Sequence, residues 1–173
     1  RSNGCVAVLE TGTARGVSAA CLASAVAHRA SGKVVTFDPH DYPGRDDLWA
    51  ALPPPMRAAI EQRPLDSLQG MQAALEAGEC YDAALLDSVH DEEHVWQEFQ
   101  LAARLVSPGG LILVHDPCLP TGSVGRAIRR IEEAGYGVAR LWTAESGEQE
   151  DDGLGLAVIT NRLSRQPGGE CSQ

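Results

Sequence analysis

Five acidic residues stand where apolar segments of this chain end, and their types and spacing are suited to chemistry. The five are Glu10, Asp38, Asp66, Asp87 and Asp116. Short apolar runs rich in β-branched residues are typical of buried parallel strands. In an open α/β sheet, ligands bind outside the carboxyl ends of the strands. Any one acid alone is also compatible with a solvated strand end, but several on one rim predict a binding site.

A glycine turn follows the first of these strands. Gly12 and Gly16 bracket it, and 17–30 is then Ala-rich with helical spacing. Strand, glycine turn and helix form the first half of a nucleotide-binding βαβ unit, because glycine allows unusual backbone angles and close approach of a ligand. Asp38 comes 22 positions after Gly16. At that distance a carboxylate lies beside the turn, where it accepts hydrogen bonds from both hydroxyls of a ribose.

Histidines lie close to the later acids. His90 follows Asp87 by three positions and is our candidate general base, since an imidazole titrates near neutral pH; an exposed residue at a helix start is the alternative. For His115, next to Asp116, we expect a hydrogen-bonded core histidine. The stretch from His90 to His94 also matches His-x-x-Glu-His, the inverted zinc-peptidase motif, which requires both histidines on one helical face and a different fold.

The elements that position these residues alternate along the chain. Periodicity predicts strands at 5–10, 33–38, 59–63, 81–87 and 111–116, and helices at 17–30, 45–52, 68–77, 92–106 and 123–134. Two further strands, 136–143 and 154–161, have no helix between them, which indicates an antiparallel hairpin. We therefore predict a Rossmann-like, doubly wound α/β fold with a mostly parallel seven-stranded sheet and helices on both faces. It forms one domain over 1–163, followed by a polar tail over 164–173.

Composition narrows the class of protein. The 173 residues carry a formal net charge of −10, which argues against nucleic acid as a partner. No apolar run approaches the roughly 20 residues that cross a bilayer, and the first residues do not resemble a signal peptide. Five cysteines without Cys-x-x-Cys spacing predict a reduced, cytoplasmic protein. Cys5, Cys21 and Cys80 are expected to be small core residues.

The motif Glu10-x-Gly12-x-x-x-Gly16-x-Ser18, followed by Asp38, resembles the S-adenosylmethionine site of class I methyltransferases. It departs from the dinucleotide motif Gly-x-Gly-x-x-Gly because no second glycine is present for a pyrophosphate, which the methyl donor lacks. The stretches Tyr-Asp-Ala-Ala-Leu-Leu-Asp-Ser-Val-His and Leu-Val-Ser-Pro-Gly-Gly-Leu-Ile-Leu-Val-His-Asp resemble small-molecule O-methyltransferases. These include the catechol and caffeoyl-CoA enzymes and the antibiotic-pathway enzymes of the cephalosporin and macrolide-sugar type.

The resemblance implies roles for individual residues. Asp87 and Asp116 match positions that hold Mg²⁺ in metal-dependent relatives. Those relatives have an acid or asparagine beside the later aspartate, where this chain has His115 and Pro117, so the third ligand is left open. His90 and Asp87 would be catalytic, and Trp49 lies in the region that shapes the acceptor pocket. The residues expected to hold the donor are Glu10, Gly12, Thr13, Gly16, Ser18, Asp38, Asp66 and Ser67, the last two next to the adenine.

The function predicted on these grounds is methyl transfer from S-adenosylmethionine to a hydroxyl of a small molecule, with or without Mg²⁺. The alternative is a non-catalytic methyltransferase-like domain that binds or assembles. An NAD-dependent oxidoreductase is less favoured, because the short-chain enzymes need Tyr-x-x-x-Lys and Lys33 is the only lysine in the chain. Related enzymes are often dimers or larger, which leaves a homo-oligomer open.

Overall fold

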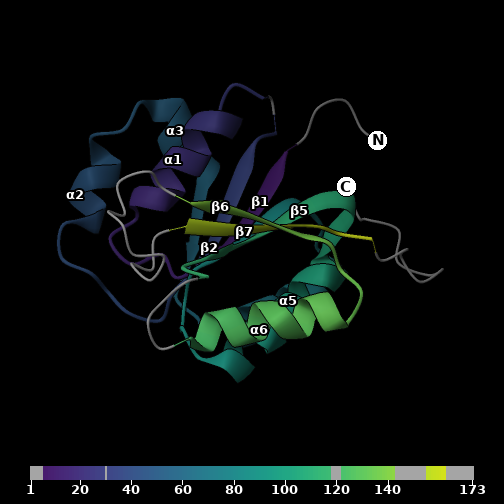
Figure 1. Ribbon diagram of the computed structural model, residues 1–173. Coiled ribbons are helices and arrows are strands. Elements are labelled where there is room, and N and C mark those ends of the chain that lie inside the picture. Colours follow the sequence, from purple (N-terminus) through teal and green to yellow (C-terminus); the bar gives the residue numbers. More distant parts are fainter. Residues whose placement is uncertain (1–5, 30, 118–121, 143–154, 163–173) are drawn as a thin grey trace.

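The computed structural model describes residues 6–29, 31–117, 122–142 and 155–162. In this part of the chain seven strands form one sheet with helices on both faces (Figure 1). The strands are β1 (Ala7–Thr11), β2 (Lys33–Phe37), β3 (Ile60–Arg63), β4 (Tyr81–Leu86), β5 (Val106–His115), β6 (Val138–Trp142) and β7 (Gly155–Thr160). The helices are α1 (Val17–Val26), α2 (Arg45–Ala50), α3 (Pro54–Ala59), α4 (Ser67–Glu76), α5 (Glu92–Leu105) and α6 (Ser123–Glu133).

The strand order is β3-β2-β1-β4-β5-β7-β6. Strands β1 to β5 pair in parallel, whereas β7 runs antiparallel to both β5 and β6. The predicted Rossmann-like sheet with its antiparallel C-terminal hairpin is therefore confirmed. The chain order reverses between β1 and β4, and in a doubly wound sheet such a switch point is where ligands bind.

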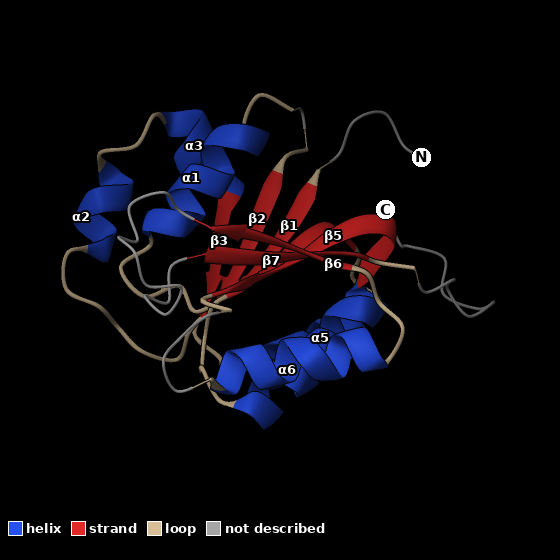
Figure 2. Ribbon diagram, in the orientation of Figure 1, coloured by secondary structure: helices blue, strands red, loops and turns tan. Residues whose placement is uncertain are grey.

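Strands β1 and β2 are buried on both faces along most of their length. Val8 and Val34 pack with one cluster, whereas their neighbours Leu9 and Val35 pack with the other. Alternate side chains of a strand point to opposite faces, so two covered faces require the continuous apolar runs seen in the sequence. Figure 2 shows α1, α2 and α3 on one side of the sheet and α5 and α6 on the other. Buried helix residues include Ala19, Ala23 and Trp49 on the first side and Met71, Phe99 and Ile128 on the second.

Strand β5 is longer than predicted. It begins at Val106 rather than Leu111, and its register against β4 shifts between these two residues. The buried amide of Asn161, just after β7, donates hydrogen bonds to the carbonyls of Ala103 and Val106 at 2.9 and 2.6 Å. The backbone of Asn161 also bonds the segment itself, because its carbonyl accepts from the amide of Gly109 and its amide donates to the carbonyl of Gly110, both at 2.8 Å. These bonds hold the Pro-Gly-Gly segment in the sheet, where local turn signals predict only a loop.

The expectation of a core position is wrong for Cys21, and the expectation of a reduced thiol is wrong for Cys80. Cys21 is a free and exposed thiol, and Cys80 is disulfide-bonded. The described helices are all too short or too polar to span a bilayer. Three predicted features lie outside the described residues: the tail over 164–173, the other three cysteines, and the inner ends of the hairpin at 143 and 154. The domain bounds and the compartment stay predictions.

Candidate functional site

The predicted site residues gather along the carboxyl edge of the sheet, in two groups on either side of the switch point. The first group surrounds the turn between β1 and α1. The second lies at the ends of β4 and β5. The members are Glu10, Gly12, Thr13, Gly16, Ser18 and Asp38 in the first group, and Asp87, His90, His115 and Asp116 in the second.

The glycine turn packs directly on its neighbours. Gly12 and Gly16 have φ of 80° and 75°, which favours glycine. A Cβ on Gly12 would lie 2.0 Å from the carbonyl oxygen of Asp87, and one on Gly16 would lie 2.5 Å from Nε1 of Trp49. Both positions therefore need glycine for conformation and for space. Gly16 is the N-cap of α1 and brings no capping side chain, so the first amides of the helix suit an anionic group of a ligand.

Asp38 is held beside this turn, as its spacing predicts. Its carboxylate is nearly buried, with 6% of the residue exposed. Oδ2 accepts a hydrogen bond from the amide of Ala14 at 2.8 Å, and Oδ1 accepts one from the amide of His40 at 2.9 Å. Each carboxylate oxygen has a second lone pair. That of Oδ1 faces Nδ1 of the exposed His40 side chain at 3.2 Å. Oδ2 therefore offers an acceptor to a ligand hydroxyl such as one of a ribose, and Oδ1 offers a second where the His40 imidazole gives way.

Glu10 lies beneath the turn and is fully buried. Its Oε2 accepts a hydrogen bond from the hydroxyl of Thr36, and the hydroxyl of Thr13 lies 2.7 Å from that of Thr36. Since Thr36 gives its proton to Glu10, Thr13 donates to Thr36. Burial raises the pKa of Glu10 from 4.5 to about 7, against the opposing effect of the Ser18 and Thr36 hydroxyls. Oε1 is buried with no hydrogen-bond partner, so this carboxyl favours a proton or a cationic ligand.

The side chain of Thr13 thus supports the turn from below, and a contact of this residue with a ligand would have to come from its backbone. Thr36 was not among the predicted site residues. The register places it directly opposite Glu10 in β2, and it is the one polar residue in Val-Val-Thr-Phe. A polar side chain inside a strand that is otherwise apolar was the signal that could have identified it.

We expect Glu10→Gln to stabilise the protein above pH 7. The folded state keeps a proton on Glu10 up to about pH 7, whereas the unfolded chain releases it near 4.5. The folded state then binds more protons, so stability falls as pH rises between these values, by about 3 kcal/mol in all. At pH 8 the glutamine variant should gain about 1–3 kcal/mol in free energy of unfolding, and at pH 5 it should gain little.

Urea unfolding of both proteins at pH 5 and pH 8 measures this difference. The matched control is Glu133→Gln, an exposed glutamate of α6, which should leave the pH dependence unchanged. An equal effect of Glu10→Gln at the two pH values would contradict the raised pKa.

The sequence position of Trp49 suggested that it lines an acceptor pocket, but its side chain is buried instead. It is 3% exposed, and its Nε1 donates a hydrogen bond to the carbonyl of Gly16 at 2.9 Å. The guanidinium groups of Arg45 and Arg57 lie 5.7 and 5.4 Å from the centre of its ring. Because α2 packs the indole against the turn, Trp49 positions the turn instead of contacting an acceptor. Trp96, in contrast, packs on Phe99, with ring centres 5.9 Å apart.

Trp49→Phe should remove this hydrogen bond and leave the Gly16 carbonyl with only the bond from the amide of Ala20, at 3.1 Å. We expect a loss of about 1–2 kcal/mol in stability and, under the function proposed below, a several-fold weaker donor affinity. Trp96→Phe, on the opposite face of the sheet, is the control. It should lower the melting temperature without changing donor binding, as measured by calorimetry. The prediction fails if the two variants weaken donor binding alike.

Asp66 and Ser67 lie at the start of α4, on the β3 side of the site. Asp66 is the N-cap of the helix and accepts hydrogen bonds from the amides of Leu68 and Gln69 at 3.0 and 3.4 Å. Ser67 is buried, and its hydroxyl lies 2.9 Å from Nε2 of His94. Asp66 therefore fixes the helix start at this edge, and contact with an adenine stays a prediction for both residues.

His94 and His90 do not form the zinc-peptidase pair. Helix α5 begins at Glu92 with Asp91 as its N-cap, so His90 precedes the helix. Nε2 of His94 lies 2.9 to 3.5 Å from Ser67, Ser88 and Glu98 instead. The His-x-x-Glu-His interpretation is therefore wrong, because the two imidazoles belong to different environments.

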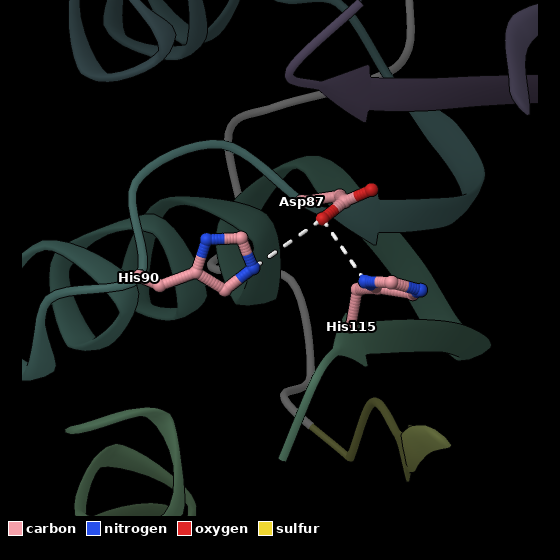
Figure 3. A group of neighbouring side chains, drawn as sticks. All are labelled: Asp87, His90 and His115. Atoms are coloured by element: carbon pink, nitrogen blue, oxygen red, sulfur yellow. Dashed lines mark ion pairs between the residues drawn. The ribbon is translucent and has the colours of Figure 1, made fainter. Parts of the chain in front are cut away.

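The second group joins the ends of β4 and β5 (Figure 3). Nε2 of His90 lies 3.6 Å from an oxygen of Asp87 and 3.6 Å from one of Asp116. Nδ1 of His115 lies 3.2 Å from Asp87 and 3.1 Å from Asp116. About a third of the His115 side chain is exposed. His115 is therefore not a core histidine, and the sequence-based expectation for it is wrong.

This group is also unusual in its hydrogen bonding and backbone. Asp116 has a φ of 52°, in the left-handed region. Among the described residues, three atoms of the group are buried without a hydrogen-bond partner: Nε2 of His90, Nδ1 of His115 and Oδ1 of Asp116. The carboxylate of Asp87, and to a lesser extent that of Asp116, raises the pKa of His115. Two carboxylates and two imidazoles thus converge without completing each other's hydrogen bonds.

Comparisons with known proteins identify the family of the chain. A family model described as a methyltransferase domain matches residues 9–117, which includes the glycine turn and both groups of site residues. No curated protein matches the chain.

Three solved structures illustrate the likeness in fold. The O-methyltransferase TomG from Streptomyces achromogenes, involved in tomaymycin synthesis and in complex with SAM, has a TM-score of 0.68 at 20% identity; the match covers 91% of this chain and 73% of that one. An O-methyltransferase from Bacillus cereus in complex with SAH has a TM-score of 0.66 at 21% identity, and the match covers 89% of this chain and 73% of that one. An rRNA methylase from Streptococcus thermophilus has a TM-score of 0.63 at 14% identity, and the match covers 93% of this chain and 89% of that one. At these identities the likeness shows the fold alone.

Proposed function

The chain belongs to the methyltransferase domain family, and we propose that it transfers the methyl group of S-adenosylmethionine to a hydroxyl group of a small molecule. The observation that carries the proposal is the Asp38 carboxylate, which two backbone amides fix beside the glycine turn at the switch point of the sheet. The bound SAM of TomG and SAH of the Bacillus cereus enzyme support this choice of donor.

The first group of residues suits each part of the donor. Asp38 would accept hydrogen bonds from the ribose hydroxyls, and the amides at the start of α1 would face the carboxylate of the methionine part. Glu10, with its unpartnered oxygen, would attract the amino group. The α4 start at Asp66 and Ser67 would lie beside the adenine. The donor carries a sulfonium cation, so an acidic rim also favours it electrostatically.

The second group suits the acceptor. In an in-line displacement the acceptor oxygen forms a bond to the methyl carbon, the carbon–sulfur electron pair returns to sulfur, and S-adenosylhomocysteine leaves. The hydroxyl proton would pass to Nε2 of His90, and the carboxylate of Asp87, 3.6 Å away, would stabilise the imidazolium. The protein's main tasks are then to align the two substrates and accept one proton.

A small molecule is favoured over a nucleic acid as acceptor. The chain carries a formal net charge of −10, and Asp87 and Asp116 stand at the edge where the acceptor would bind. Such a surface repels phosphate groups. The rRNA methylase among the similar structures has the same fold, so charge, rather than fold, supports this part of the proposal.

The expected Mg²⁺ fits this site only in part. The carboxylates of Asp87 and Asp116 are the hard oxygen ligands that Mg²⁺ prefers, but the imidazoles of His90 and His115 turn toward the same point. Mg²⁺ is usually held by carboxylates, phosphates and water instead of nitrogen donors. No step of the proposed reaction therefore depends on Mg²⁺.

Calorimetry with S-adenosylmethionine, followed by transfer of an isotope-labelled methyl group to a panel of phenols, sugars and an RNA control, tests the proposal. We expect micromolar donor binding and labelling of hydroxyl compounds but not of RNA. Absence of donor binding would overturn the proposal. Donor binding without transfer to any acceptor would favour the alternative of a non-catalytic binding domain.

A further inference from the structure

The cluster formed by Asp87, His90, His115 and Asp116 has a mixed set of donor atoms. We infer that Asp87, His90 and His115 bind a divalent transition metal of the Zn²⁺ or Co²⁺ class, in preference to the Mg²⁺ that the sequence resemblance implies. The inference rests on three features of the cluster: its distances, its unpartnered atoms and the chemistry of its ligands.

The distances are close to those of a metal site. The ligand atoms of Asp87, His90 and His115 all lie within 4.8 Å of one another, and Oδ1 of Asp87 is 3.6 and 3.2 Å from the two imidazole nitrogens. In a tetrahedral site with bonds of about 2.0–2.1 Å, ligand atoms lie about 3.4 Å apart. Figure 3 shows both imidazoles turned toward Asp87 from separate elements. Small side-chain rotations would complete three ligands around one ion.

The unpartnered atoms are the ones that would face the ion. Nε2 of His90 and Nδ1 of His115 are buried without a hydrogen-bond partner, as is Oδ1 of Asp116. Buried polar atoms without a partner cost free energy and call for an explanation such as an unseen ion. A bound cation would satisfy both nitrogens together with Asp87. Asp116, which lies 3.1 Å from His115 and 3.6 Å from His90, would be a fourth ligand or would orient the imidazoles.

The ligand chemistry selects the metal. Two imidazole nitrogens and one carboxylate are a ligand set of catalytic zinc sites and of non-haem iron sites. Mg²⁺ demands octahedral oxygen coordination and keeps several waters. For nitrogen-containing sites the affinity of divalent metals rises from Mn²⁺ toward Cu²⁺ and Zn²⁺. The two histidines thus shift the metal preference of this cluster from Mg²⁺ toward Zn²⁺ or Co²⁺.

This inference deepens the proposed function by naming the ion of its acceptor side. A metal on Nε2 of His90 occupies the lone pair that the proposed base uses. The two roles of His90 therefore belong to different forms of the protein, with base catalysis in the metal-free form. The metal is tested by binding alone, without donor or acceptor, so failure here leaves the donor-binding test untouched.

The experiment is titration of the EDTA-stripped protein with Zn²⁺, Co²⁺ and Mg²⁺ by calorimetry, together with the visible absorption spectrum of the Co²⁺ form. We expect one Zn²⁺ or Co²⁺ per chain, bound at least about 100-fold more tightly than Mg²⁺. The Co²⁺ form should absorb strongly in the visible range, as low-coordinate Co²⁺ does. Mg²⁺ binding as tight as Zn²⁺ binding, or no ion bound below millimolar concentration, would overturn the inference.

Variants locate the site. His115→Asn and His90→Asn should each weaken Zn²⁺ and Co²⁺ binding by at least about tenfold without weakening Mg²⁺ binding. His28→Gln, an exposed histidine remote in sequence from this cluster, is the control and should bind like the native chain. Circular dichroism of the metal-free variants confirms folding. Unchanged Zn²⁺ affinity in both cluster variants would place any bound ion elsewhere and contradict the inference.

Discussion

In the metal-free protein, His90→Gln is expected to lower the rate of methyl transfer by about 10²- to 10⁴-fold, the usual contribution of a general base. Glutamine keeps the length and hydrogen-bonding ability of the side chain but does not accept the acceptor's proton. Donor affinity should not change, because His90 is not among the residues that would hold the donor. The rate is measured with saturating donor in EDTA, using any acceptor found in the labelling panel.

His28→Gln serves again as the control and should retain full activity. Asp87→Asn should lower the rate less than His90→Gln does, since Asp87 only stabilises the imidazolium in this scheme. If the metal-free native protein is inactive and gains activity on adding Zn²⁺, His90 is not the base and the metal-bound form is the active one. If His90→Gln keeps the native rate in EDTA, another group takes the proton.

Asp38→Ala should weaken S-adenosylmethionine binding by about 100-fold or more. Two hydrogen bonds from the ribose hydroxyls to a carboxylate are lost, each contributing about 1.5–3 kcal/mol. The amides of Ala14 and His40 also lose their acceptor, so the turn around Ala14 is held less firmly. Ala14 itself has a φ of 43°, a conformation that needs such support. Calorimetry with the donor measures the change.

Asp38→Asn separates the two effects, because it keeps one carbonyl oxygen and the shape of the side chain. We expect it to bind more weakly than the native chain and more tightly than Asp38→Ala. Asp46→Asn, an exposed acid in the first turn of α2, should bind like the native chain. Native-like affinity in a folded Asp38→Ala protein would contradict the assignment of Asp38 to the ribose, and the proposed function would lose its main support.

Local sequence patterns were sufficient to predict the fold and the group of residues around the glycine turn. The glycine turn at Gly12 and Gly16, with Asp38 22 positions later, defines a strand, a turn and a crossover helix. The spacing is informative because the helix between two neighbouring parallel strands has to span a nearly fixed length. The apolar runs that end in acids likewise predicted the strands whose carboxyl ends form the rim. These features were predictable because each depends on periodicity or on conformations restricted to a few residue types.

The remaining features depend on contacts between distant segments, which only the tertiary structure decides. Trp49 reaches Gly16 because α2 folds back over the turn, and Thr36 meets Glu10 because of the register of β1 and β2. The raised pKa of Glu10 follows from burial, which no local pattern reports.

His115 shows the limit most clearly. The sequence placed it near the end of a buried strand, and it was expected to be a hydrogen-bonded core histidine. The structure instead turns it toward Asp87, beside a residue with left-handed backbone at Asp116. Periodicity assigns a strand residue to one face or the other, but at the strand's end the face is set by backbone angles and by the neighbouring strand. For that reason the sequence predicted two carboxylates and the imidazole of His90 here, and only the packing of β4 against β5 added the imidazole of His115.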